Sequence, residues 1–474
     1  MARTQYDITI IGGGSGGLTA ARIAAKLGAN VLLIDKERLG GDCLNYGCVP
    51  SKSLVHVARV VQQAKDAAAF GLTLANLDVD MAKVSQYIQG VISRVAAGEK
   101  VYTEGVTVKF GKVAFKSPTA LSLNGEEFMS RSTLIATGSR PATPDVAGLL
   151  EVGYLTNEHA FSLLHLPASI VIVGGGPMGV ELGQALRRLG TAVTIIQGPD
   201  RILPKEDPEV SAAVASVLAN EGINIYTGAR FVKAGRNGDK KIVTARQGNQ
   251  LLNIEAHEIL LALGRQPNVE GLNLEAAGIK YDNKGIKVDE YLQTATANIL
   301  AIGDVIDGYL FTHVAAYQAG VAVRNALVPV GKKKVDYRVV PWCTFTDPEA
   351  ARVGLTPGEA EKQYKQVRIV KFPWNQIDRA QAENETVGFI KLVLAGKKDE
   401  LVGAHMVGAR AGEMLAELSL AMRHKLALKD IRDTIHVYPT MTTALQQTAF
   451  EAYLESNAAA NNRKRVRTIL SLRG

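Results

Sequence analysis

The sequence predicts an α/β protein with two three-layer domains, each built on a largely parallel sheet, followed by a C-terminal α+β domain. A unit of strand, glycine-rich turn and helix occurs twice, at residues 8–35 and 170–197. Three further apolar runs end at glycine, which is typical of buried strands that deliver a loop to a ligand. After Asp336 the glycine-rich units stop, and strands alternate with amphipathic helices. A chain of 474 residues is too long for one hydrophobic core, so several domains are expected.

The first glycine-rich unit predicts a Rossmann-like nucleotide-binding domain. A strand at residues 8–11 leads into a helix at residues 18–27, and a second strand at residues 31–34 ends in Asp35. The glycines between the first strand and the helix, in G-x-G-x-x-G spacing, are Gly12, Gly14 and Gly17. Glycine lets the backbone approach a pyrophosphate, the helix N-terminus supplies N–H donors, and the acid accepts from a ribose hydroxyl. We therefore expect a dinucleotide here.

The second glycine-rich unit predicts a second nucleotide site, or the other half of one larger site. Its strands cover residues 170–173 and 193–196, and its glycines are Gly174, Gly176 and Gly179. The second strand ends in Gln197 instead of an acid, and Arg201 follows four residues later. Loss of the carboxylate removes the usual preference for a free 2′-hydroxyl, and an arginine could accept a 2′-phosphate. This unit therefore favours NADPH over NADH.

The three other glycine-ended strands lie at residues 133–141, 259–268 and 298–307. We expect them to bring loops to the same ligands. The residues that they deliver are Thr137, Gly138, Gly264, Arg265 and Asp304. Asp304 is the one carboxylate among them.

Two of the three cysteines lie close together in GGDCLNYGCVPSK, residues 40–52. A metal site, a structural bridge or a redox couple would each explain Cys43 and Cys48. A metal site needs two more soft or imidazole ligands at finger-like spacing, and none lies nearby in the sequence. No apolar run reaches the length of a spanning helix, and the start has no export pattern, so we expect a cytoplasmic protein. In that compartment a close cysteine pair is catalytic more often than structural.

The formal charge of +8 is concentrated at the C-terminus. The basic residues of the last dozen positions are Arg463, Lys464, Arg465, Arg467 and Arg473. Because the rest of the chain is only mildly basic, no nucleic-acid partner is predicted. Residues 461–474 are expected to form a solvated basic tail, and the alternative is a contact with an anionic membrane or partner.

The complete set of motifs resembles the FAD-dependent pyridine nucleotide–disulfide oxidoreductases of class I. Two dinucleotide fingerprints, C-x4-C after the first, ATG, LGRxPN and AxGD occur in the order of that family. The resemblance implies FAD on the first fingerprint, with Asp304 at its ribityl–phosphate region, and NADPH or NADH on the second. It also implies a homodimer, built through residues from about 336 onward, in which the partner completes each active site.

The same resemblance implies roles for the cysteines. Cys48 corresponds to the flavin-proximal sulfur and Cys43 to the sulfur that exchanges with substrate, while Lys52 and Glu181 correspond to the ion pair beside the flavin. The residues agree with this assignment. A helix is expected to begin near Pro50, and a thiol at a positive helix end has a lowered pKa. We therefore interpret the pair as a flavin-coupled redox couple.

The chain departs from the family near its C-terminus. Disulfide-reducing members carry H-P-T-x-x-E, in which a histidine oriented by the glutamate moves the proton that thiol exchange requires. Here Tyr438 and Thr443 hold the histidine and glutamate positions, and His436 lies two residues upstream, where an extended chain points it to the same side. Mercuric reductases carry tyrosine at this place, so the closest resemblance in site chemistry is to them. The chain has neither the C-terminal vicinal cysteine pair nor the N-terminal metal-binding domain of many such enzymes, and Cys343 is interpreted as a buried interface residue.

The predicted function is transfer of electrons from NAD(P)H through FAD to the Cys43–Cys48 disulfide and on to a soft metal ion such as Hg(II), held transiently by the two thiolates. The alternative is dihydrolipoamide dehydrogenase-like or other disulfide reduction with His436 as the base. A remote alternative is a non-catalytic redox-sensing flavoprotein. The predicted parts are an FAD-binding domain (1–148 and 271–335), an NAD(P)-binding domain (149–270), a dimerisation domain (336–460) and the basic tail (461–474).

Overall fold

The computed structural model describes residues 5–73, 77–328 and 330–472. Its first sheet has seven strands in the order β3-β2-β1-β6-β5-β4, with β18 beside β6. The strands are β1 Gln5–Ile11, β2 Val31–Asp35, β3 Val106–Phe110, β4 Val113–Phe115, β5 Ala120–Leu123, β6 Glu126–Ile135 and β18 Ile299–Ala301. All neighbours are parallel except the β4-β5-β6 meander. Because β18 comes from much later in the chain than the rest, this sheet is assembled from two separate segments of the chain.

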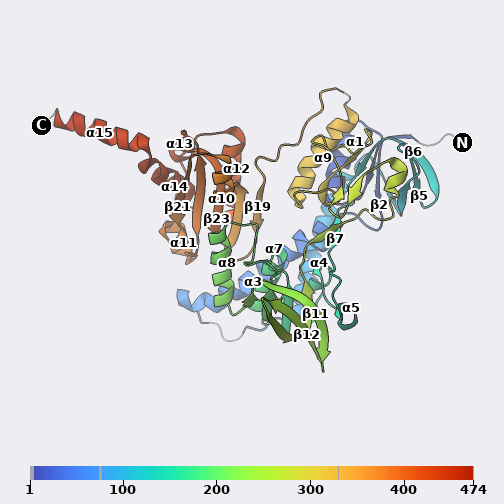
Figure 1. Cartoon of the computed structure of the whole chain (residues 1–474), viewed down its shortest axis with the longest axis horizontal. Coiled ribbons are helices and arrows are strands. Elements are labelled where there is room, and N and C mark those ends of the chain that lie inside the picture. The colour runs from blue at the N-terminus through green and yellow to red at the C-terminus, as the bar shows by residue number, and fades with distance from the viewer. Residues whose placement is uncertain (1–4, 74–76, 329, 473–474) are drawn as a thin grey trace.

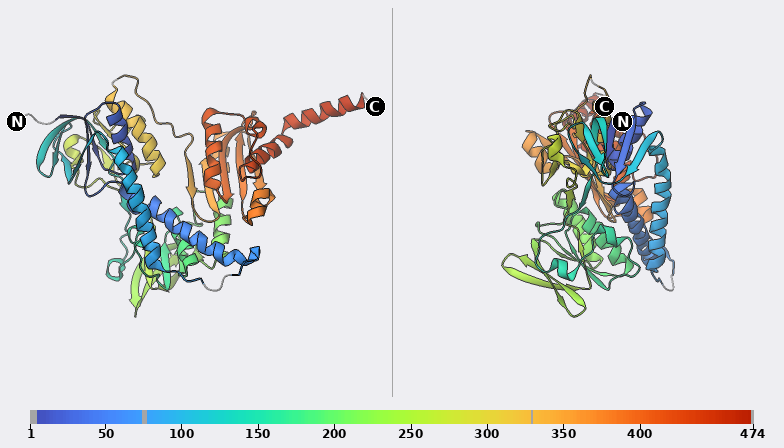
Figure 2. Two further views of the ribbon diagram at one scale, coloured as in Figure 1. Left: turned by 180° about the vertical axis from the view of Figure 1, so that it is seen from behind. Right: turned by 90° about the vertical axis from the view of Figure 1, so that its right-hand side faces the viewer.

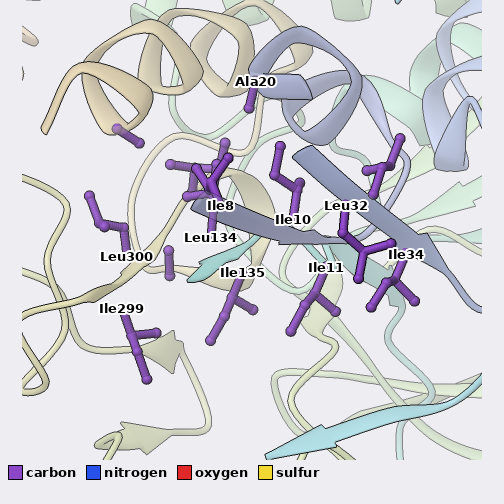
Figure 3. Close-up of a cluster of buried hydrophobic side chains, with 14 of the residues drawn as sticks. Ile8, Ile10, Ile11, Ala20, Leu32, Ile34, Leu134, Ile135, Ile299 and Leu300 are labelled. Atoms are coloured by element: carbon purple, nitrogen blue, oxygen red, sulfur yellow. The ribbon is translucent and has the colours of Figure 1, made fainter. Parts of the chain in front are cut away.

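Helices α1 (Ser15–Lys26) and α9 (Thr312–Leu327) pack against each other and cover this sheet. Figure 3 shows the core beneath them, where Ile8, Ile10 and Leu134 are fully buried. Strands covered on both faces need apolar residues at nearly every position, which explains the runs ITII, apolar except for the buried Thr9, and LLI in the sequence. This rigid sheet holds the first fingerprint at the C-terminal end of β1.

The second unit has a four-stranded parallel sheet in the order β10-β9-β8-β14. Its strands are β8 Ser169–Val173, β9 Ala192–Ile196, β10 Asn224–Tyr226 and β14 Glu258–Leu261. A three-stranded antiparallel sheet joins it, made of β11 Ala229–Asn237, β12 Lys240–Gln247 and β13 Gln250–Ala256. Its main helices are α7 (Pro177–Leu189) and α8 (Pro208–Asn220). The strand pair β7 (Ser139–Pro141) and β15 (Arg265–Pro267) links the two units.

The helix that follows the cysteines packs on the second unit. Helix α3 (Cys48–Lys65) lies against α7 and against α4 (Met81–Gly98). Leu54 and Ala58 of α3 share one core with Val180 of α7. Its N-terminus therefore lies where the two nucleotide-binding units meet. The helix begins two residues before the predicted Pro50.

A five-stranded antiparallel sheet in the order β19-β20-β23-β22-β21 forms the C-terminal domain. Its strands are β19 Pro341–Thr344, β20 Glu349–Gly354, β21 Val367–Pro373, β22 Phe389–Ala395 and β23 Glu400–Gly408. Its helices are α10 Pro357–Gln363, α11 Asp378–Glu383, α12 Ala411–His424, α13 Leu428–Asp433 and α14 Thr443–Leu454. Trp374 is fully buried in its core. The antiparallel sheet with its helices is an α+β arrangement, as the sequence predicts.

The chain ends in helix α15 (Asn457–Ser471), which extends away from the body (Figures 1 and 2). The shorter elements are α2 Gly41–Asn45, α5 Leu149–Val152, α6 Asn157–Ala160, β16 Tyr281–Asp282 and β17 Gly285–Ile286. In the described ranges no helix is both long enough and apolar enough to cross a membrane.

Candidate functional site

The first and last glycines of each fingerprint lie in tight turns that admit no side chain at these positions. At Gly12, with φ +107°, a Cβ atom would lie 2.3 Å from the Ala136 carbonyl oxygen. At Gly17 it would lie 1.8 Å from the carbonyl oxygen of Gly12, so the helix can pack this closely only on glycine. Gly174, with φ +117°, is constrained in the same way as Gly12. A Cβ atom at Gly179 would lie 1.9 Å from the Gly174 carbonyl oxygen.

The second glycine of each fingerprint lies directly before a helix. Gly14 precedes α1 and Gly176 precedes α7, and neither helix start has a side-chain cap. A Cβ at Gly176 would meet nothing within 4 Å, so the space in front of α7 is open. Uncapped first-turn amides with open space before them fit a pyrophosphate, because they offer N–H donors at the positive end of a helix.

The residue at the end of the second strand closes the glycine turn in both units. Asp35 Oδ2 accepts from the Gly13 amide at 2.7 Å, and Gln197 Oε1 accepts from the Gly175 amide at 2.7 Å. Gln197 is buried, and Arg201 donates to the Pro204 carbonyl at 3.0 Å. A neutral amide at this position carries no charge that would repel a 2′-phosphate.

The two cysteines lie together at the start of α3. Both are free thiols, and Cys43 hydrogen-bonds to Cys48. The Cys48 thiolate accepts this bond, which lowers the pKa of Cys48 to about 6, with help from Thr312 and Lys52. Because Cys43 donates the bond, its own pKa is raised well above the ordinary value. Cys48 is the first residue of α3, where the helix dipole also favours a thiolate. Thr312 Oγ1 lies 3.4 Å from Cys48 Sγ.

Alkylation of the reduced protein by iodoacetamide checks this division of roles between the two cysteines. Because the lowered pKa of about 6 makes the Cys48 thiolate the major form above pH 6, its reaction rate is expected to rise around that pH. A Cys43→Ala variant loses the hydrogen bond from Cys43 that stabilises the Cys48 thiolate, so the midpoint should move upward by about one pH unit or more. Peptide mass spectrometry identifies the alkylated residue. An unchanged midpoint in Cys43→Ala would contradict the assignment.

An ion pair lies one helical turn beyond Cys48. Lys52 Nζ contacts Glu181 Oε2 at 2.8 Å, and the Glu181 side chain is buried. The other Glu181 oxygen accepts from the Phe345 amide at 2.9 Å, and the Lys52 ammonium lies 4.5 Å from the centre of the Phe345 ring. The pair forms because α3 packs on α7, which carries Glu181. It holds a positive charge beside the cysteine pair.

The loops predicted to line the ligands are bonded to one another. Asp304 Oδ2 accepts from Ser139 Oγ at 2.7 Å and lies 3.4 Å from Arg265 Nε, while burial raises the Asp304 pKa. Arg265 also pairs with Asp42, the neighbour of Cys43, at 3.2 Å.

Thr137 Oγ1 donates to the Asn268 carbonyl at 2.7 Å, and Gly138 adopts φ +65°. Gly264 adopts φ +104° before β15. Ser139, Asp42 and Thr312 could not be predicted from the sequence, because each is a common polar residue with a distant partner.

Tyr438 and His436, which lie where the chain departs from the family motif, are outside this group of hydrogen-bonded loops. Tyr438 is exposed, and its hydroxyl donates to Asp378 Oδ2 at 2.9 Å, a contact that raises the Tyr438 pKa. His436 contacts the Thr434 carbonyl oxygen through Nδ1 at 2.9 Å and Glu417 through Nε2 at 3.1 Å. Both ring nitrogens are therefore engaged. Among the described residues, no hydrogen bond or ion pair joins Tyr438 or His436 to the cysteine region of the same chain.

Cys343 lies on β19, half-buried, with its sulfur 3.1 Å from where a Cβ on Gly412 would be. Burial raises its pKa well above the ordinary value, so it stays a thiol. In the part of the chain that the structure covers, no three histidine, cysteine, aspartate or glutamate side chains are grouped to hold a metal ion. A metal ion at Cys43 and Cys48 would therefore find two ligands from this chain.

Comparison with known proteins decides the family. Residues 6–320 match the pyridine nucleotide-disulphide oxidoreductases, and residues 340–449 match the dimerisation domain of the same family. The chain belongs to this family. The recognition and the fold class predicted from the motifs are thus confirmed. This oxidoreductase is FAD-dependent and uses NAD(P)H like its relatives, and its dimerisation domain indicates a homodimer. The alternative of a non-catalytic flavoprotein is set aside.

Relatives with different acceptors are equally similar to this oxidoreductase. A mercuric reductase of Staphylococcus aureus is 36% identical over 449 residues, which cover 94% of this chain and 82% of the relative. A dihydrolipoyl dehydrogenase of Bacillus subtilis (strain 168) is 36% identical over 466 residues, which cover 95% of this chain and 98% of the relative. A Cu(II) complex of the HOCl-induced flavoprotein disulfide reductase RclA from Escherichia coli superposes with a TM-score of 0.83 at 28% identity, covering 93% of this chain and 98% of that one. Overall similarity therefore leaves the acceptor open.

Proposed function

We propose that this oxidoreductase uses NADPH to reduce a thiophilic metal ion, with Hg(II) the leading candidate, at the Cys43–Cys48 pair. The observation that carries the proposal is Tyr438, whose hydroxyl is held by Asp378 at the position where disulfide reductases place a catalytic histidine. A phenol with a raised pKa is a poor base at neutral pH, but its oxygen can contact a bound metal. The mercuric reductase relative and the Cu(II) complex of RclA support a metal acceptor.

The cofactors are proposed to bind as the fingerprints suggest. The chemistry that FAD supplies when bound is passage of an electron pair between the nicotinamide and a disulfide. We place FAD on the turn of Gly12, Gly14 and Gly17, with Asp35 at its ribose, and the nicotinamide nucleotide on the turn of Gly174, Gly176 and Gly179. The other proposed contacts are Lys52, Thr137, Gly138, Gln197, Arg201, Gly264, Arg265 and Asp304. Lys52, fixed by Glu181, would hold positive charge at the reacting end of both cofactors.

The thiols of this chain bind and orient the metal ion. Cys48, with its pKa of about 6, supplies one thiolate at neutral pH, and the soft ion itself displaces the proton from Cys43. The balance is one NADPH and one Hg(II) giving NADP⁺, Hg(0) and one proton. For Cu(II), two ions each take one electron from the same NADPH. No proton has to be delivered to a leaving sulfur, so the reaction works without a histidine base.

The partner subunit is proposed to complete the site. The segment that contains His436 and Tyr438 belongs to the matched dimerisation domain, and its neighbours Ile435 and Val437 are 94% and 76% exposed in the single chain. Apolar side chains this exposed are typical of an interface. In a symmetric dimer each segment could then reach the Cys43–Cys48 pair of the partner.

The test measures NADPH oxidation driven by Hg(II) in the presence of excess small thiol. Wild-type enzyme is expected to turn over, and Tyr438→Phe is expected to lower kcat/KM for the ion about tenfold, because one ligand atom is removed. His436→Ala should stay within about twofold of wild type, because its ring is bonded to Glu417 and Thr434. Absence of metal-driven turnover in the wild type, with either Hg(II) or Cu(II), would end the proposal.

A second candidate is oxidation of dihydrolipoamide, with His436 as the base. It is favoured by the dihydrolipoyl dehydrogenase relative and by the His436–Glu417 contact, which reproduces a histidine oriented by a carboxylate. A role as base requires the His436 ring to break its hydrogen bond to Thr434 or to Glu417. In this case dihydrolipoamide should be oxidised with NAD⁺ at a rate that His436→Ala abolishes, and equal rates in the two proteins would exclude the role.

A further inference from the structure

Among the described residues, the hydrogen bonds that join helix α15 to the body come from its first two turns. Ser456 caps its N-terminus, where Oγ accepts from the Ala459 amide. Asn462 Nδ2 donates to the Tyr453 hydroxyl at 2.9 Å, and Arg463 Nη1 donates to the Leu454 carbonyl at 2.9 Å. From Lys464 to the end of the described chain every residue is exposed, and the helix points away from the rest of the molecule (Figures 1 and 2).

The free part of α15 is amphipathic. Val466, Ile469 and Leu470 follow helical spacing of three and four and continue a strip that begins at the buried Ala459. These three side chains are 52%, 51% and 62% exposed. The rest of the circumference carries the basic side chains of Lys464, Arg465 and Arg467 together with the polar Thr468 and Ser471. The helix therefore presents a narrow apolar strip flanked by positive charge.

The charge of this segment has one sign. No aspartate or glutamate follows Glu455, and the five basic residues beyond position 462 supply more than half of the formal charge of +8. The remainder of the chain is close to neutral and slightly basic, so a second copy offers no net negative surface. A bilayer that contains anionic lipid does, and it also receives apolar side chains, which a nucleic acid does not.

We propose that α15 docks this oxidoreductase peripherally on an anionic lipid bilayer. The helix would lie in the plane of the headgroups, with Val466, Ile469 and Leu470 inserted and the basic side chains at lipid phosphates. It is too short to span a bilayer, because its 15 residues are fewer than the ~20 that a spanning helix needs. Since attraction between exposed charges is screened by salt, binding should weaken as ionic strength rises.

The test uses full-length, FAD-loaded protein in a vesicle flotation assay. Vesicles of phosphatidylcholine with about one-third phosphatidylglycerol are expected to carry at least about tenfold more protein than phosphatidylcholine alone. Lys464→Gln/Arg465→Gln/Arg467→Gln should reduce binding to the neutral-lipid level, and Ile469→Ser/Leu470→Ser should also reduce it strongly. The matched control Lys365→Gln/Lys397→Gln/Lys398→Gln removes the same charge from exposed positions elsewhere and should bind like wild type.

Four outcomes would overturn the proposal. The first is equal binding to both vesicle types, and the second is equal loss in the α15 charge variant and its matched control. The third is wild-type retention by duplex DNA but not by anionic vesicles, which would make α15 a nucleic-acid contact. The fourth is a shift of the α15 charge variant to monomer in sedimentation, with no vesicle binding by the wild type, which would place α15 at the subunit interface.

Discussion

A Cys43→Ser variant is expected to lose acceptor reduction by at least about 10³-fold, whichever acceptor the enzyme uses. Cys43 is the partner whose pKa is raised, so it holds the proton while Cys48 carries the charge. Serine preserves the size of the side chain and a hydrogen bond to Cys48. It cannot form a disulfide, and its hydroxyl is a poor ligand for a soft ion. Turnover with Hg(II), Cu(II) and dihydrolipoamide should therefore fall together.

Two controls separate loss of the redox pair from loss of the fold. Reduction of ferricyanide by NAD(P)H needs no cysteine, so it should persist in Cys43→Ser. Cys343→Ala removes the third thiol, which stays protonated on β19, and should keep metal-driven turnover within about twofold of wild type. Turnover in Cys43→Ser above about a tenth of the wild-type rate would show that electrons reach the acceptor by another route.

The parts of the site that the sequence predicts are those set by local backbone geometry. Gly12 and Gly17 are recognisable because a side chain at either position would collide with a neighbouring carbonyl group, and the same holds for Gly174 and Gly179. In the two fingerprint units the predicted strand and helix limits lie within about three residues of the observed ones, because apolar runs and glycine breaks fall within one short window. The glycine-ended runs at residues 133–141 and 259–268 each form two separate strands instead of one. The family resemblance followed from the order of these local motifs.

The parts that the sequence does not predict depend on long-range packing. Lys52 and Glu181 are 129 positions apart and meet because α3 lies on α7. No periodicity indicates this contact, and only the family resemblance brought the two residues together. Asp378 and Glu417 are not predicted from the sequence, although they hydrogen-bond to the candidate site residues Tyr438 and His436. A carboxylate far away in sequence gives no local signal of its partner.

The strongest expected effect on stability lies where the C-terminal sheet meets the second nucleotide-binding unit. Lys391 of β22 contacts Asp207 at 2.7 Å, and the exposed fractions of the two side chains are only 4% and 3%. Lys391 also contacts the half-exposed Glu209 at 2.7 Å. Lys391→Met is expected to lower the free energy of unfolding by about 3–5 kcal/mol, because Asp207 stays buried without its counter-charge. Urea denaturation of the FAD-loaded enzyme measures this loss.

Matched variants show whether the unpaired charge is the cause. Lys371→Gln removes an exposed ion pair to the same Glu209 and should cost no more than about 0.5 kcal/mol. Asp207→Asn keeps the cap that Asp207 provides to the Glu209 amide of α8, but removes the buried charge. Lys391→Met/Asp207→Asn should therefore regain more than half of the loss of Lys391→Met. If Lys391→Met were no worse than Lys371→Gln, desolvation of the buried pair would already balance its attraction. The domains would then be held together by contacts such as that of Glu181 with the Phe345 amide.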